Sequence, residues 1–86
     1  MKVDMDYGLT NHARQRIKER NISIKLVEEA VSNPTKISVD SKGVLILKKA
    51  VLIKGKRRLL LIAGQVRENK FKIFTIIDTS KVKKYL

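Results

Sequence analysis

The sequence predicts an α+β domain in which two N-terminal helices pack on one face of a four-stranded antiparallel β-sheet. Two observations carry this prediction. Apolar residues recur at helical spacing through the first 35 residues, and they follow strand-like patterns after Thr35. No repeat, low-complexity tract or linker divides the chain, so residues 1–86 are expected to form a single domain.

The first helix is marked by its two ends. Thr10 or Asn11 supplies a side-chain oxygen that can cap the free backbone N–H groups of the first turn. The helix then runs to Arg20. Asn21 is a suitable end because asparagine tolerates the left-handed backbone conformation that often terminates helices.

The second helix begins after Ser23, another residue type that caps helices. It ends at Asn33, because the residue before Pro34 avoids helical backbone angles. Its apolar face consists of Leu26, Val27, Ala30 and Val31.

The remaining chain reads as four strands separated by turns. The turns are predicted at residues 41–43, at Gly55 and at residues 67–70, where glycine or polar residues interrupt the apolar pattern. The tail is either a last helical turn or an additional edge strand. The strands are predicted at residues 37–39, 44–53, 58–63 and 71–77.

Charge is the strongest compositional signal. The formal net charge is +12, and residues 36–86 hold fourteen basic and three acidic side chains. Such a surface suits a polyanion, since each neutralised phosphate releases condensed counterions. General solubility, an acidic protein partner and anionic lipid are the competing explanations. We expect nucleic acid, with RNA first.

Several classes of protein are disfavoured by composition. The chain has no cysteine, and no apolar run reaches the roughly 20 residues of a membrane span, so cytoplasmic placement and no membrane partner are expected. With one histidine, no zinc-ligand spacing exists, and Asp4 and Asp6 are expected to fray. No metal and no cofactor are therefore predicted.

One helical stripe combines a histidine with arginines. His12, Arg16 and Arg20 are four residues apart, a spacing that drifts only about 40° around a helix. A neutral imidazole can accept a proton and two guanidiniums can hold a phosphate. Alternatively, the three side chains only cap or cover the edge of the core. The stripe is expected where the helix meets the sheet, because it overlaps the apolar positions Leu9, Ala13 and Ile17.

Several motifs resemble a small prokaryotic family called domain of unknown function 4258. Its opening has His, Arg and Arg-Gly-Ile-Ser at the same spacing, and Asn21 stands where the family usually has glycine. The matching N-terminal segments are Leu9-Thr10-Asn11-His12, Arg16, Arg20-Asn21-Ile22-Ser23 and Glu29 to Pro34. The matching C-terminal segments are Arg58-Leu59-Leu60, Thr75 and Thr79 to Leu86.

That family is similar in turn to the RelE, ParE and BrnT toxins, which implies a RelE/ParE-toxin-like fold and metal-independent RNA cleavage through the 2′-hydroxyl. Such cleavage requires a base, an acid and cations for the developing phosphorane charge. The catalytic candidates implied are His12, Arg16, Arg20, Arg58, Thr75 and Tyr85. The candidates for unspecific contact with nucleic acid are Lys56, Arg57, Lys81, Lys83 and Lys84.

Two alternatives to an endoribonuclease stay open. One is a non-catalytic basic module that binds nucleic acid, because the same cations serve binding without chemistry. The other is a protein-binding module of the same fold, neutralised by an acidic antitoxin, because fold alone does not decide function.

Overall fold

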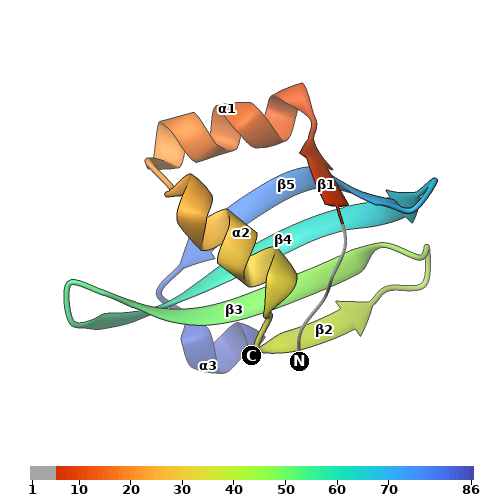
Figure 1. Ribbon diagram of the computed structural model, residues 1–86. Coiled ribbons are helices and arrows are strands. Elements are labelled where there is room, and N and C mark those ends of the chain that lie inside the picture. The colour runs from red at the N-terminus through yellow and green to blue at the C-terminus, as the bar shows by residue number, and fades with distance from the viewer. Residues whose placement is uncertain (1–5) are drawn as a thin grey trace.

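The computed structural model describes residues 6–86, which form a five-stranded mixed sheet with two helices on one face and a short helix on the other (Figure 1). The helices are α1 (Asn11–Arg20), α2 (Ile24–Ser32) and α3 (Val82–Tyr85). The strands are β1 (Asp6–Leu9), β2 (Lys36–Val39), β3 (Leu45–Ile53), β4 (Lys56–Arg67) and β5 (Lys70–Thr79).

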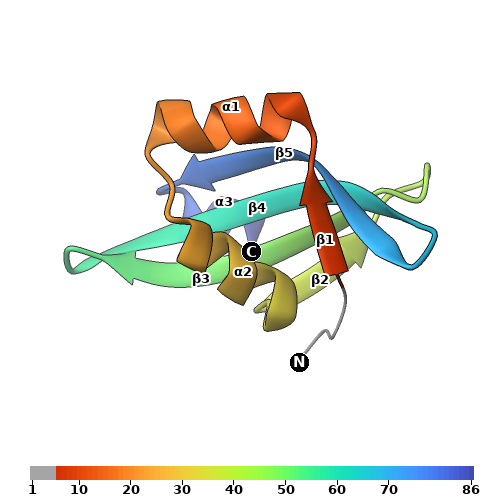
Figure 2. The same ribbon diagram turned by 45° about the horizontal axis from the view of Figure 1, so that its top comes forward.

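The spatial order of the strands is β1-β5-β4-β3-β2. Strands β2 to β5 pair antiparallel with their neighbours, whereas β1 pairs parallel with β5. Figure 2 shows α1 above β5 and α2 in front of β3, with α3 behind the sheet. We call the face under α1 and α2 the helix face, and the opposite face, which carries α3 beside β4, the open face.

The predicted four-stranded, wholly antiparallel sheet with two helices is therefore wrong. The segment around Asp6, expected to fray, forms β1, because Tyr7 and Leu9 pack against the core while the backbone pairs with β5. Asp4 lies outside the described residues. The tail also adds a third helix, α3, which is the helical alternative for this segment.

The caps of α1 are the ones expected from the sequence. The Thr10 hydroxyl accepts a hydrogen bond from the Ala13 backbone N–H at 3.1 Å, and Asn21 has left-handed backbone angles. The same hydroxyl donates to the Phe74 carbonyl at 3.3 Å. Ser23 occupies the cap position of α2, but its side chain makes no capping hydrogen bond.

The hairpin turns also follow the sequence. Lys54 and Gly55 both have positive φ between β3 and β4, and Glu68 and Asn69 do so between β4 and β5. Two consecutive residues of positive φ give the turn whose twist matches that of the flanking strands. These turns fix the register of β4 against both neighbours.

Core packing occurs mainly on the helix face. The alternation of side chains along a strand sends every second residue of β3, β4 and β5 toward α1 and α2. The buried cluster consists of Ala13, Ile17, Val27, Ala30, Val31, Leu47, Leu60, Ile62, Phe71, Ile73 and Ile76. On the open face, Leu59 and Val82 are buried where α3 lies against β4.

Gly64 is required where β4 passes a bulge in β5. Gly64 pairs with Ile73 and Ala63 pairs with Thr75, so Phe74 is the extra residue. A Cβ on Gly64 would collide with the Lys72 carbonyl oxygen and lie 2.9 Å from the Phe71 ring. Neither neighbour can move freely, since one is backbone and the other is a core side chain.

We predict that Gly64→Ala lowers the free energy of unfolding by about 2 kcal/mol, because the added methyl overpacks the centre of the sheet. Urea denaturation measures the change. Gly8→Ala is the matched control, because its Cβ would meet the flexible end of Lys70 at 3.0 Å. Its effect should be within about 0.5 kcal/mol. Equal losses in both variants would contradict the packing argument.

Candidate nucleic-acid interface

The sheet divides the sequence-predicted site residues into two groups. Arg58 shares the helix face with Leu60 and Ile62, both of which belong to the core under α1 and α2. Its neighbour Arg57 points to the open face and lines a hollow beside α3. Arg57 and Arg58 are adjacent in the sequence but therefore lie on opposite faces of the sheet.

His12 and Arg16 lie together on the outer side of α1. Arg16 donates a long hydrogen bond from Nε to His12 Nε2 at 3.5 Å. The His12 ring is exposed and borders a shallow hollow with Gln15 and Glu19. The expected position at the junction of helix and sheet is therefore wrong for His12.

Asp78 relates Arg58 to Arg20, because it pairs with Arg58 and lines the same cavity as Arg20. Arg58 Nε donates to Asp78 Oδ1 at 2.7 Å, and both side chains are less than one-third exposed. Asp78 and Arg20 line one cavity, which we call the α1–α2 pocket. Two of the predicted catalytic arginines thus belong to one region of the helix face.

The α1–α2 pocket has a volume of about 400 Å³. It lies between the turn that joins α1 to α2 and the adjacent ends of β3, β4 and β5. Its polar groups are contributed by Arg20, Lys25, Glu29 and Asp78. Its apolar wall is contributed by Ile22, Leu26, Val51, Ile53 and Leu60.

Asp78 was missed because the sequence shows no second carboxylate near it. Its partner is basic and lies twenty residues earlier in the chain. The signal was present in the strand pattern, because Asp78 is two residues after the buried Ile76 and so points to the same face. A hairpin turning at residues 67–70 then brings it toward Arg58.

Thr75 and Tyr85 are separated from His12 by the sheet. Thr75 pairs with Ala63 and alternates with the buried Ile76, which places its side chain on the open face. Tyr85 is on α3, where its ring is 40% exposed and lies 5.5 Å from the Lys84 ammonium. The six predicted catalytic residues therefore do not form one site.

The predicted nucleic-acid contacts gather at the end of the sheet near α3. Arg57 lines a hollow with Lys81, Lys83 and Lys84. Lys56 is exposed at the start of β4, beside the turn that joins it to β3. Four of the five predicted cations thus line one hollow, whereas Lys56 alternates with Arg57 and points to the helix face; the role of all five in binding stays a prediction.

More cations lie on the open face than the sequence analysis identified. Their strand neighbours Ile37, Leu47, Phe71 and Ile73 pack into the helix-face core, so the cations between them point the other way. This alternation was the signal that could have found them. They are Lys36, Lys48, Arg67, Lys70 and Lys72.

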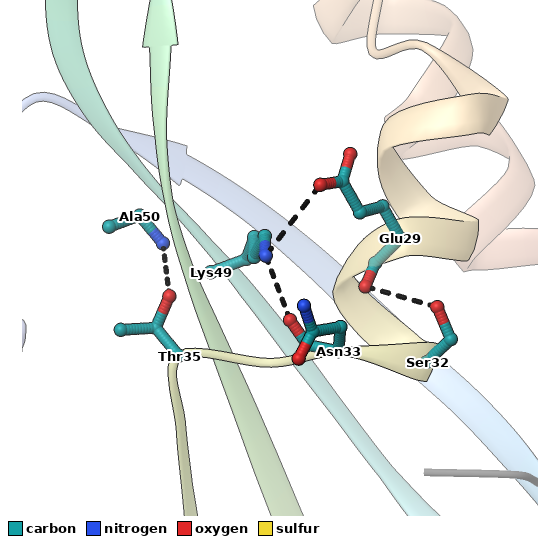
Figure 3. A network of polar contacts seen from close by, with 6 residues as sticks. All are labelled: Glu29, Ser32, Asn33, Thr35, Lys49 and Ala50. Atoms are coloured by element: carbon teal, nitrogen blue, oxygen red, sulfur yellow. Dashed lines mark hydrogen bonds and ion pairs between the residues drawn. The ribbon is translucent and has the colours of Figure 1, made fainter. Parts of the chain in front are cut away.

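The helix-face cations Lys49 and Arg58 are paired within the fold. Figure 3 shows the Lys49 ammonium donating to the Asn33 carbonyl at 2.8 Å and lying 3.7 Å from Glu29 Oε1. The ammonium thereby satisfies a carbonyl just beyond the C-terminus of α2, where a cation is favourable. Nearby, the Thr35 hydroxyl accepts from the Ala50 backbone N–H at 3.0 Å.

Open-face cations have a different environment. Among residues 6–86 the ion pairs are Glu29 with Lys49 and Asp78 with Arg58, and both lie on the helix face. The carboxylates nearest the open face, Asp6 on β1, Asp40 after β2 and Glu68 in the β4–β5 turn, form no ion pair among residues 6–86. The open face therefore presents a group of cations without ion-pair partners in the described chain.

Across residues 6–86 no group of three His, Asp or Glu side chains is placed to hold a metal ion. No helix in that same range has the length and apolar character needed to cross a membrane.

Comparison with known proteins gives one match. A family model described as "Domain of unknown function (DUF4258)" matches residues 9–78. This range includes α1, α2 and most of the sheet, and it leaves out α3. No curated protein and no solved structure matches the chain.

The pairing of Arg58 with Asp78 generates a prediction about stability. A double-mutant cycle with Arg58→Gln and Asp78→Asn should give a coupling energy of about 1 kcal/mol, because the contact is short and shielded from solvent. Urea denaturation of the four proteins supplies the measurement. The control cycle uses Lys49→Gln and Glu29→Gln.

In that control the carboxylate is 61% exposed and the atoms are 3.7 Å apart. Its coupling should stay below about 0.5 kcal/mol, as for most surface ion pairs. Equal coupling in the two cycles would show that burial and geometry do not distinguish the pairs.

Proposed function

Because the chain belongs to the DUF4258 family, whose description assigns no activity, we propose its function from its surface: it binds RNA through the open face. The observation that carries the proposal is the set of cations there without carboxylate partners. Strand cations Lys36, Lys48, Arg57, Arg67, Lys70 and Lys72 are joined by Lys81, Lys83 and Lys84 of the C-terminal segment.

Electrostatics supports a polyanion as the ligand. Lys36 and Lys48 are directly opposed in neighbouring strands, and like charges in that position repel each other. A phosphate backbone relieves such repulsion and releases its own counterions on binding. Lys49 and Arg58, strand cations of the helix face, have less to gain, since they already contact carboxylates.

RNA is favoured among polyanions by the resemblance to RelE-like toxins inferred from the sequence motifs, which implies action on RNA. A lipid surface is less suitable, because the chain has no basic amphipathic helix with Trp or Phe along its apolar side. Tyr85, half-exposed beside Lys84, offers one aromatic ring on which a base can stack.

Binding without cleavage is the form of the proposal that the geometry supports. Cleavage through the 2′-hydroxyl needs a base, an acid and cations around one phosphate. His12 is exposed on the helix side, whereas Thr75 and Tyr85 lie across the sheet. A phosphate held on the open face therefore cannot reach the imidazole.

An acidic protein partner, such as an antitoxin, is a second candidate for the same surface. Two apolar side chains on the open face favour it: Leu52 is 73% exposed and Ile77 is 51% exposed. Exposed apolar groups framed by charge are typical of protein interfaces. A complex with such a partner should persist in moderate salt, because burial of these side chains does not depend on counterions.

We predict a steep salt dependence for binding to a single-stranded RNA oligomer. If about six phosphates are neutralised, the slope of log K against log salt should be roughly −4. Lys48→Ala with Arg57→Ala should reduce the magnitude of this slope by about 1.4. Fluorescence anisotropy with a labelled RNA measures both quantities between about 50 and 200 mM salt. The screening length of the salt changes over this range, so the binding constant changes measurably.

The matched control is Arg14→Ala with Lys18→Ala, which removes the same charge from exposed positions of α1. For this double variant, the slope of log K against log salt should stay close to that of the unchanged protein. Equal reductions in the two double variants would mean that net charge, rather than the open face, determines binding.

The same RNA, incubated in EDTA and analysed for products, tests cleavage. Our proposal expects intact RNA because His12 is remote from the open face. A product that appears with the unchanged protein and disappears with His12→Ala would instead support the endoribonuclease hypothesis.

A further inference from the structure

The α1–α2 pocket is a second potential binding site, on the opposite side of the sheet from the RNA-binding face proposed above. Its volume of about 400 Å³ lies within the range of small-ligand sites. One side is apolar, formed in part by Ile22, Leu26 and Val51. The other side carries charged groups from α1, α2 and β5.

The charges of the pocket leave an excess of cations. Its two carboxylates are already paired, Glu29 with Lys49 and Asp78 with Arg58. Arg20 and Lys25, which also line it, form no ion pair among residues 6–86. A ligand that fills this space therefore gains most if it is an anion.

Arg58 does not line the pocket but lies beside it, since it pairs with Val51 in the neighbouring strand and with Asp78, and both of these line it. Its Nε is occupied by Asp78 at 2.7 Å, and its two terminal nitrogens make no hydrogen bond within the described chain. A guanidinium held in this way keeps a fork of N–H donors that matches two phosphate oxygens. Asp78 thus acts as a positioning residue for Arg58.

We propose that the α1–α2 pocket binds one unpaired nucleotide, with its phosphate at Arg20 and Arg58 and its base against the apolar wall. Inorganic phosphate would satisfy the cations but leave Leu26 and Val51 exposed to water. A nucleotide satisfies both sides of the pocket. Sequence-specific RNA recognition commonly uses such splayed-out bases.

The chain connects this pocket to the cations of the open face. Asp78 lines the pocket, and Ser80 and Lys81, two and three residues later, line the hollow beside α3. A single strand can therefore pass around the end of β5, with one nucleotide in the pocket and the following phosphates near the α3 lysines. This extension rests on the proposed RNA binding, whereas the pocket itself does not.

Methyl NMR tests the proposal, because a nucleobase shifts nearby methyl resonances through its ring current and inorganic phosphate does not. The protein is titrated with inorganic phosphate, each of the four nucleoside monophosphates, single-stranded RNA and duplex RNA. We expect the methyl signals of Ile22, Leu26 and Val51 to move with at least one monophosphate and with single-stranded RNA. They should stay in place with phosphate and duplex.

Substitutions test whether Arg20 and Arg58 contact the phosphate of the bound nucleotide. Arg20→Ala should weaken monophosphate binding about tenfold, since it removes hydrogen bonds to a charged group. Arg58→Lys, which keeps the charge but loses the fork, should weaken it as well. Arg14→Ala, an exposed cation of the same helix away from the pocket, is the control and should leave binding unchanged.

The outcomes for the two sites are distinguishable. If RNA binds with a steep salt slope while the pocket methyl signals stay in place, the nucleotide proposal is overturned and the open-face proposal stands. If monophosphates move these signals but RNA does not bind, the pocket stands and the proposed function fails. Equal weakening by Arg20→Ala and Arg14→Ala would also overturn the pocket.

Discussion

The structure depends on the burial of β4 from both sides. Leu60 and Ile62 pack under α1 and α2, while Leu59, on the opposite face, is buried where α3 lies against the strand. This double burial fixes β4 at the centre of the five strands and determines the direction of every side chain along it. It also directs Arg57 and Arg58 to different faces, so that neighbouring cations have different environments and different possible roles.

The distribution of charge follows from this arrangement. On the helix face Lys49 and Arg58 contact carboxylates, and the Lys49 ammonium also satisfies a carbonyl after α2. Open-face cations form no ion pair with an Asp or Glu side chain among residues 6–86, although Lys36 donates to the Leu86 carbonyl oxygen and Arg67 to the Gln65 side chain. A net charge of +12 by itself is compatible with solubility or with any acidic partner. The row of cations on neighbouring strands of the open face is what favours a ligand with a regular array of negative charges.

Local features of the fold were predictable from the sequence, and non-local ones were not. The Thr10 cap, the left-handed Asn21 and the hairpin turns at Gly55 and residues 67–70 depend on a few adjacent residues. Strand β1 depends on a parallel pairing with β5, more than sixty residues away, which no local pattern reports. The catalytic site predicted from the sequence is not assembled in the fold, for a related reason. His12, Thr75 and Tyr85 were grouped by resemblance, whereas strand alternation alone places Thr75 opposite to the buried Ile76.

Lysine footprinting tests most directly whether one face of the sheet binds RNA. The protein is acetylated with and without single-stranded RNA, and the modification of each lysine is measured by mass spectrometry. The account predicts that RNA protects Lys36, Lys48, Lys72 and Lys83, which belong to the open face or to α3, and leaves Lys18 on the outer side of α1 reactive. Protection of Lys18 equal to that of the open-face lysines, or unchanged reactivity at all of them, would contradict it.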